Sequence, residues 1–90
     1  MAYITQSDRK DKRYLATFDN GTKIHFGLKG GQTFIDHADK AKREAYIKRH
    51  AKNENWDDPY TAGALSRFIT WGESTNINKN IADFKKRFNL

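Results

Sequence analysis

The chain has 90 residues, with 17 Lys and Arg against 11 Asp and Glu, which gives a net charge of +6 near neutral pH. This length corresponds to one domain and is too short for a two-lobed enzyme with its own cofactor fold. Cysteine is absent, so neither a disulfide nor a thiolate metal site can stabilise the fold. A charged fraction of 31% argues against a membrane-spanning segment, and the excess of cations favours an acidic partner.

The beginning of the chain mixes both signs of charge without apolar periodicity, which predicts a flexible polar arm over residues 1–12. The apolar run at residues 2–4 is too short for a secretory signal. We therefore expect the protein in the cytosol or nucleus, or in a particle assembled there. Residues 13–90 are expected to form one domain.

A β-hairpin is predicted over residues 13–26, because two short runs flank Asn20-Gly21, the strongest short-range hairpin signal. Both residues tolerate the positive φ of a type I′ turn. Alternate residues from Tyr14 to Phe18 would share one face and lie against a core. A ribbon of two strands is marginally stable by itself, so it has to pack on helices.

Three helices are predicted, near residues 37–52, 59–71 and 75–88. Asp36 can cap the first, and Asp58 followed by proline can begin the second. The last has the clearest amphipathic pattern, with apolar residues at helical spacing: Ile77, Ile81, Phe84 and Phe88. The predicted fold class is α+β, a single small domain in which a short N-terminal hairpin packs against about three helices.

The positive charge is concentrated on the first and last predicted helices. Residues 37–53 carry six basic and two acidic groups, and residues 76–90 carry four and one. Side by side, these helices would form a surface for nucleic acid or another acidic partner. Its residues would be Lys42, Arg43, Lys48, Arg49, Lys52, Lys79, Lys85, Lys86 and Arg87. The alternative is that these side chains only keep the helices soluble.

Between the basic helices, residues 54–75 carry one basic and four acidic groups. Complementary ends of this kind suit packing against other proteins or copies of the same chain. Trp56 and Trp71 bracket the second helix and could anchor a protein partner or stack a base, although in so small a domain both could be core. The candidate protein-contact residues are Trp56, Tyr60, Arg67 and Trp71, and Arg67 is expected to pair with the local acids.

No group of residues indicates catalysis. Asp36, His37 and Asp39 form the single cluster of ligand-type side chains, but the zinc spacings are absent, so we expect neither a metal nor another cofactor. No serine lies in a nucleophile-elbow context, and the adjacent carboxylates of Asp57 and Asp58 would splay apart. We predict no catalytic residue and expect that the chain is not an enzyme. A Mg²⁺-dependent nuclease at the first cluster is the one enzymatic alternative.

An ordered set of motifs resembles a family of short basic proteins encoded by large nucleocytoplasmic DNA viruses of algae and protists. The resemblance runs from about Arg13 to Leu90, and its motifs are Ile24–Gly27, Phe34–Asp39, Lys42-Arg43, Tyr46–His50, Glu54–Trp56, Thr61–Arg67 and Trp71-Gly72. It implies a viral product that is abundant or packaged, and it supplies no active site.

From this resemblance we expect a small virion structural or interaction protein, such as a minor capsid component, located in the virion or in the host cytoplasm or nucleus. Its partners would be other virion proteins or copies of itself. The alternative is a basic protein that binds DNA or RNA in genome packaging or compaction. The structural role ranks first because the acidic middle segment would repel phosphate, and because no groove-reading motif is evident.

Overall fold

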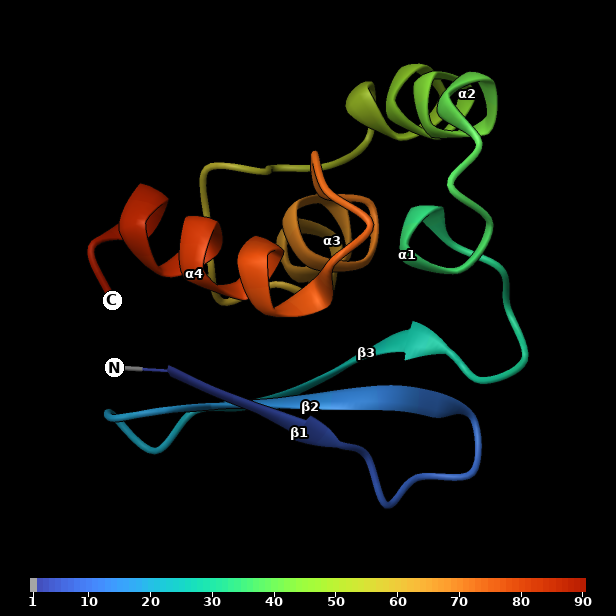
Figure 1. Ribbon diagram of the computed structural model, residues 1–90. Coiled ribbons are helices and arrows are strands. Elements are labelled where there is room, and N and C mark those ends of the chain that lie inside the picture. Colours follow the sequence, from blue (N-terminus) through green and yellow to red (C-terminus); the bar gives the residue numbers. More distant parts are fainter. Residues whose placement is uncertain (1) are drawn as a thin grey trace.

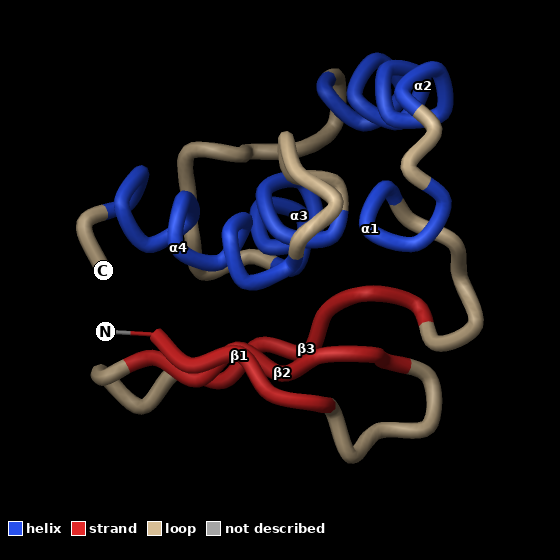
Figure 2. Tube along the Cα trace, in the orientation of Figure 1, coloured by secondary structure: helices blue, strands red, loops and turns tan. Residues whose placement is uncertain are grey.

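The computed structural model describes residues 2–90 and has two layers, a β-sheet and a layer of helices that covers one face of it (Figures 1 and 2). The strands are β1 (Ala2–Gln6), β2 (Lys12–Phe18) and β3 (Lys23–Leu28). They form an antiparallel sheet in the order β1-β2-β3. This arrangement confirms the α+β class and the N-terminal hairpin.

The helices follow the sheet in the sequence. They are α1 (Phe34–His37), α2 (Lys40–Ala51), α3 (Ala62–Leu65) and α4 (Ile77–Phe88). Helix α3 continues directly into a π-helical segment, η1 (Ser66–Thr70). In Figure 1, α3 and α4 lie over the sheet, whereas α2 lies farthest from it.

Strand β1 occupies part of the segment predicted as a flexible arm. Ala2 pairs with Phe18 and Gln6 with Tyr14, and the Ala2 side chain is fully buried. The prediction of an unstructured arm is therefore wrong for residues 2–6, because pairing with β2 orders a stretch whose own apolar pattern is weak. Met1, also part of that predicted arm, lies outside the described residues.

The hairpin turn differs from the predicted type. Gly21 has a φ of +87°, but Asn20 keeps a negative φ, so the turn is not type I′. Gly21 N–H donates to the Phe18 carbonyl at 2.9 Å, and Phe18 N–H donates to that of Thr22 at 2.9 Å. This pattern is typical of a type I turn followed by a glycine bulge. The Asn20 side chain accepts from the Thr22 amide at 3.0 Å and supports this form.

The predicted first helix begins later than expected, at Lys40, and a separate short helix, α1, precedes it. Ala38 adopts a left-handed conformation with a φ of +56°, which ends α1, and the Asp39 side chain then caps α2 by accepting from two backbone amides. Asp36, expected as a cap, instead lies inside α1. The second helix begins later than predicted because Thr61, rather than Asp58, caps it.

The core lies between the two layers, and on the sheet side it contains Ala2 of β1 together with alternate residues of β2 and β3. Its fully or nearly fully buried members are Ala2, Ala16, Phe18, Phe26, Leu65, Ile69 and Phe84. Leu65 and Ile69 come from α3 and η1, and Phe84 comes from α4. Helix α2 contributes none of these residues; Tyr46 is its one buried side chain among the described residues.

Candidate functional site

A π turn at the end of η1 organises the surroundings of the site. Trp71 N–H donates to the Ser66 carbonyl at 2.8 Å, five residues back, and the Thr70 hydroxyl donates to the same oxygen at 3.0 Å. Beyond this turn, the Trp71 carbonyl accepts from Arg43 Nε at 3.2 Å and from Arg67 Nη1 at 3.3 Å. Turns of this kind occur frequently at functional sites.

Asn80 fixes α4 against η1. This buried side chain donates from Nδ2 to the carbonyls of Ile69 at 2.8 Å and Ser74 at 2.7 Å, and its oxygen accepts from the Ser74 amide at 3.1 Å. Gly72 lies against it, and a Cβ on Gly72 would come within 2.5 Å of the Phe68 carbonyl oxygen. The two helical segments therefore meet in a tightly fitted arrangement.

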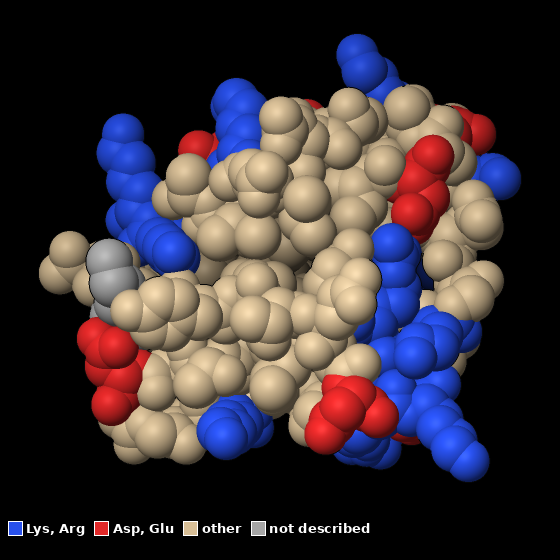
Figure 3. Space-filling view, turned by 60° about the horizontal axis from the view of Figure 1, so that its bottom comes forward, with Lys and Arg blue, Asp and Glu red and all other residues tan. Residues whose placement is uncertain are grey.

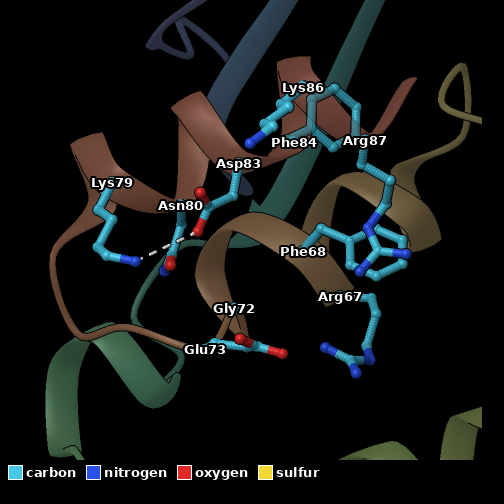
Figure 4. Close-up of a pocket in the computed structure, with 10 residues that line it drawn as sticks. All are labelled: Arg67, Phe68, Gly72, Glu73, Lys79, Asn80, Asp83, Phe84, Lys86 and Arg87. Atoms are coloured by element: carbon cyan, nitrogen blue, oxygen red, sulfur yellow. Dashed lines mark ion pairs between the residues drawn. The ribbon is translucent and has the colours of Figure 1, made fainter. Parts of the chain in front are cut away.

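Between η1 and α4 the surface is hollowed into a cleft of about 640 Å³ (Figure 4). Four cations line it, one from η1 and three from α4: Arg67, Lys79, Lys86 and Arg87. Two acids, Glu73 and Asp83, line it as well. Figure 4 shows Arg87 lying across the ring of Phe68, with Arg67 directed toward the same open space. We call this feature the basic cleft.

Arg67 is the least solvated of these cations. Its guanidinium carbon lies 5.3 Å from the Trp56 ring centroid and 5.1 Å from that of Phe68. Its buried Nε has no hydrogen-bond partner among the described residues. Burial, followed by the positive charges of Arg43 and Arg87, lowers the pKa of Arg67. A bound anion would offset the repulsion from these neighbouring positive charges.

The sequence predicted that Arg67 pairs with nearby acids, and this is not what the structure shows. The side chain instead bonds the Trp71 carbonyl and lies over two aromatic rings. The position of Arg67 in η1 explains this difference, because its side chain extends toward the end of the helix and toward Trp56. Glu73 is near enough to attract Arg67, but the two form no ion pair within the described chain.

The other predicted basic residues do not form one surface with the cleft. Lys85 is outside it, and α2 lies at the other end of the helix layer from α4 (Figure 1). Arg43 is used internally, since its Nε also donates to the Gly72 carbonyl at 2.9 Å. The remaining predicted cations of α2 and its C-terminal end are exposed, namely Lys42, Lys48, Arg49 and Lys52.

The predicted protein-contact residues are mostly engaged within the fold. Trp71 stacks on Tyr46 with ring centroids 4.3 Å apart and an interplanar angle of 3°. Trp56 is half-buried under Arg67. Tyr60 is the exposed member, at 40%, and its ring packs edge-on against Phe18. The structure thus brings Trp56, Arg67 and Trp71 together and leaves Tyr60 apart from them.

The sequence did not identify two residues of the site. Phe68 lines the basic cleft, and its partly buried ring also packs against the core. Asn80 had a detectable signal, because it lies three residues after Ile77 and four before Phe84, on the apolar stripe of α4. A polar residue in such a stripe is expected to be buried with its hydrogen bonds satisfied.

The cluster at Asp36 is used structurally. Arg13 donates to the Asp36 carboxylate at 2.7 and 3.1 Å, and the Thr33 amide donates at 2.8 Å. Burial opposes ionisation, but the bonds from Arg13 and Thr33 outweigh it and lower the pKa of Asp36 from 3.8 to about 2. Within residues 2–90, no three His, Asp or Glu side chains converge as metal ligands, and no helix is long and apolar enough to cross a membrane.

Together, the fold and the basic cleft define a small basic α+β domain whose charged side chains converge on the junction of two helical segments. Residues 2–50, more than half of the chain, match the model of a family of unknown function, DUF5754. The chain therefore belongs to this family. The match covers the sheet, α1 and nearly all of α2, and the residues that line the basic cleft follow it in the sequence. No curated protein and no solved structure matches the chain.

Proposed function

We propose that this protein binds the phosphate groups of nucleic acid in the basic cleft. The observation that carries the proposal is the grouping of four cations around one cleft, two of which, Arg67 and Arg87, lie over the ring of Phe68. Arg and Lys side chains make most contacts between proteins and the phosphate backbone, and the guanidinium group presents several N–H donors in one plane. Contact with Phe68 orders Arg67 and Arg87 before a ligand arrives, which lowers the entropy cost of binding.

The acidic residues oppose this role less than the sequence suggested. Glu54 lies 3.5 Å from His50 Nδ1, and the Asp58 side chain accepts from the Tyr60 amide at 2.9 Å. In the basic cleft, Asp83 pairs with Lys79 at 3.6 Å, but both side chains are more than half exposed, so the contact is weak. This distribution favours nucleic-acid binding over the structural role that ranked first from the sequence.

The test is a salt titration of binding to a fluorescently labelled 12-nucleotide single strand, followed by anisotropy. Counterion release predicts a fall in affinity with salt, with a slope of log K against log salt of roughly −3 for four neutralised phosphates. The double variant Lys79→Gln with Lys86→Gln should bind more weakly and reduce this slope by about 1 to 2.

The matched control is Lys10→Gln with Lys23→Gln, which removes the same charge from two exposed lysines outside the basic cleft. It should change the slope much less than the cleft variant does. Equal effects of the two double variants would mean that net charge alone drives binding. That result would contradict a role for the cleft.

A second candidate function is that of a small virion structural protein, for example a minor capsid component that packs against other virion proteins or copies of itself. One observation favours it. The sheet face away from the helices is uncovered, and Figure 3 shows that charged side chains lie mostly around the margin of this view. Leu15 and Thr17 are half-buried there, and Tyr3 is 55% exposed. Near-stoichiometric copies in purified virus particles would support this role, and absence from them would exclude it.

A further inference from the structure

A second hollow, distinct from the basic cleft, lies where α2 meets α3, η1 and the end of β3. Its volume is about 460 Å³, within the range of sites that hold small organic groups. Most of its exposed lining surface is apolar, and the lining includes the small residues Ala62, Gly63 and Ser66. Leu28, which is 65% exposed, lies at its rim. We call this feature the aromatic hollow.

Three neighbouring rings, one stacked pair and one tilted pair, line the aromatic hollow. Tyr46 lies parallel to Trp71, and on Tyr46 lies the ring of His50, with centroids 4.4 Å apart and an interplanar angle of 33°. All three residues line the hollow. The His50 side chain is 36% exposed, so this end of the stack is open to solvent. A further flat ring can extend such a stack at its open end.

The charged groups around the aromatic hollow suit a base that carries phosphates on either side. Two cations, Lys12 and Arg49, line it together with one carboxylate, Glu54. That carboxylate is directed toward His50 and lies in the space that the absent Cβ of Gly63 leaves open, since a Cβ there would collide with it. One carboxylate can balance only one of the two cations, so the lining keeps a net positive charge.

We propose that the aromatic hollow receives one unpaired base of a single-stranded nucleic acid, stacked on His50, with the neighbouring phosphates next to Lys12 and Arg49. This inference rests on the proposed function and narrows it to single strands. A base inside a duplex has both faces covered by its neighbours and cannot extend another stack. Stacking of bases on aromatic side chains tolerates any base, because every base has a flat face.

The experiment compares three labelled probes with the full-length protein: a 12-nucleotide single strand, its duplex, and a strand of equal length whose central nucleotides lack bases. The last probe keeps the phosphates and removes only the rings. We expect the intact strand to bind about 5- to 100-fold more tightly than the abasic one, which is the range of base–aromatic stacking. The duplex should bind more weakly than the intact strand. DNA and RNA versions of each probe distinguish the two sources of such a strand.

The variant His50→Ala removes the open end of the stack without touching the core or the basic cleft. It should weaken binding of the intact strand several-fold and leave binding of the abasic strand unchanged. The control His25→Ala removes a half-buried histidine on β3 and should change the binding of neither strand.

Equal binding of intact and abasic strands would overturn this inference but would leave the proposal of phosphate binding intact. Duplex binding as tight as that of the single strand would overturn it as well. Failure to bind any probe would contradict both proposals.

Discussion

Asp36 joins two parts of the molecule that are far apart in the sequence. Its carboxylate accepts two bonds from Arg13 of β2, and it also accepts from the amide of Thr33 at the start of α1. The Arg13 and Asp36 side chains are only 21% and 26% exposed, so water screens this pair less than an ordinary surface pair. A single carboxylate thus fixes α1 to the sheet.

This pair predicts a loss of stability in acid. The pKa of Asp36 is about 2 in the folded protein and near 3.8 without these partners, so the ionised group stabilises the fold above about pH 4. That contribution, about 1–2 kcal/mol after allowance for screening, should be lost as the pH falls from about 4 to about 2. Urea unfolding of Asp36→Asn should show lower stability at pH 7 and a smaller further loss in acid. Asp8→Asn, at an exposed position, should behave as the unmodified chain does. An identical acid response of Asp36→Asn and the unmodified chain would contradict this account.

At the scale of the elements, α2 is attached to the rest of the molecule by few side chains. Tyr46 stacks on Trp71, and Arg43 Nε bonds the carbonyls of Trp71 and Gly72. The rest of α2 is largely exposed. The end of η1 is therefore the main support of α2.

The attachment of α2 should weaken in alkali. Burial, followed by the nearby carboxylate of Glu54, raises the pKa of Tyr46 to about 12, whereas an unfolded tyrosine ionises near 10. The neutral phenol stabilises the fold below about pH 10, and this contribution is lost as the pH rises from about 10 to about 12. Tryptophan fluorescence and circular dichroism should report the loss. Tyr46→Phe should reduce the alkaline loss, whereas Tyr60→Phe should retain it. Loss of the same size in both variants would rule Tyr46 out as its source.

The sequence predicted an element correctly where its apolar period was strong. The repeat from Ile77 to Phe88 located α4, and the alternation from Tyr14 to Phe18 identified the buried face of β2. Strand β1 could not be found in this way, because Ala2 and Ile4 are its only side chains directed to the core, and its order comes from pairing with β2.

The site was predictable only in part. The cations of α4 were identified, but their grouping with Arg67 depends on the π turn, and no apolar period encodes a π turn. The hydrogen bonds of this turn join Trp71 and Thr70 to the Ser66 carbonyl, where the helix ends next to α2. The sequence also predicted that Arg43 binds a ligand, but its Nε donates to two backbone carbonyls of the fold.

At the scale of the whole molecule, neither layer can bury its apolar face alone. The sheet contributes Ala2, Ala16, Phe18 and Phe26 to the core, and the segments after residue 50 contribute Leu65, Ile69 and Phe84. The stretch that matches the family model contains only the first set. Chains of about 50 residues without disulfides or metals seldom bury enough apolar surface to fold.

We therefore predict that a fragment of residues 1–50 does not fold by itself. Its amide signals in a ¹H–¹⁵N spectrum should cluster in the range of unfolded peptides, and its thermal transition should lack cooperativity. The chain of 90 residues under the same conditions is the control. A dispersed spectrum from the fragment would show that the sheet, α1 and α2 form an independent unit, contrary to the shared core.

The π turn of η1 has an evolutionary consequence. Such a turn holds one residue more than an α-helical turn, so it is equivalent to a single-residue insertion in a regular helix. Because each residue of an α-helix turns the chain by about 100°, removal of one residue between 66 and 70 would rotate the segment that follows and withdraw the Trp71 carbonyl from both arginines. Relatives that lack this insertion would lose the hydrogen bonds of Arg43 and Arg67 to the Trp71 carbonyl. We expect the inserted residue and the two arginines to be gained and lost together among homologous chains.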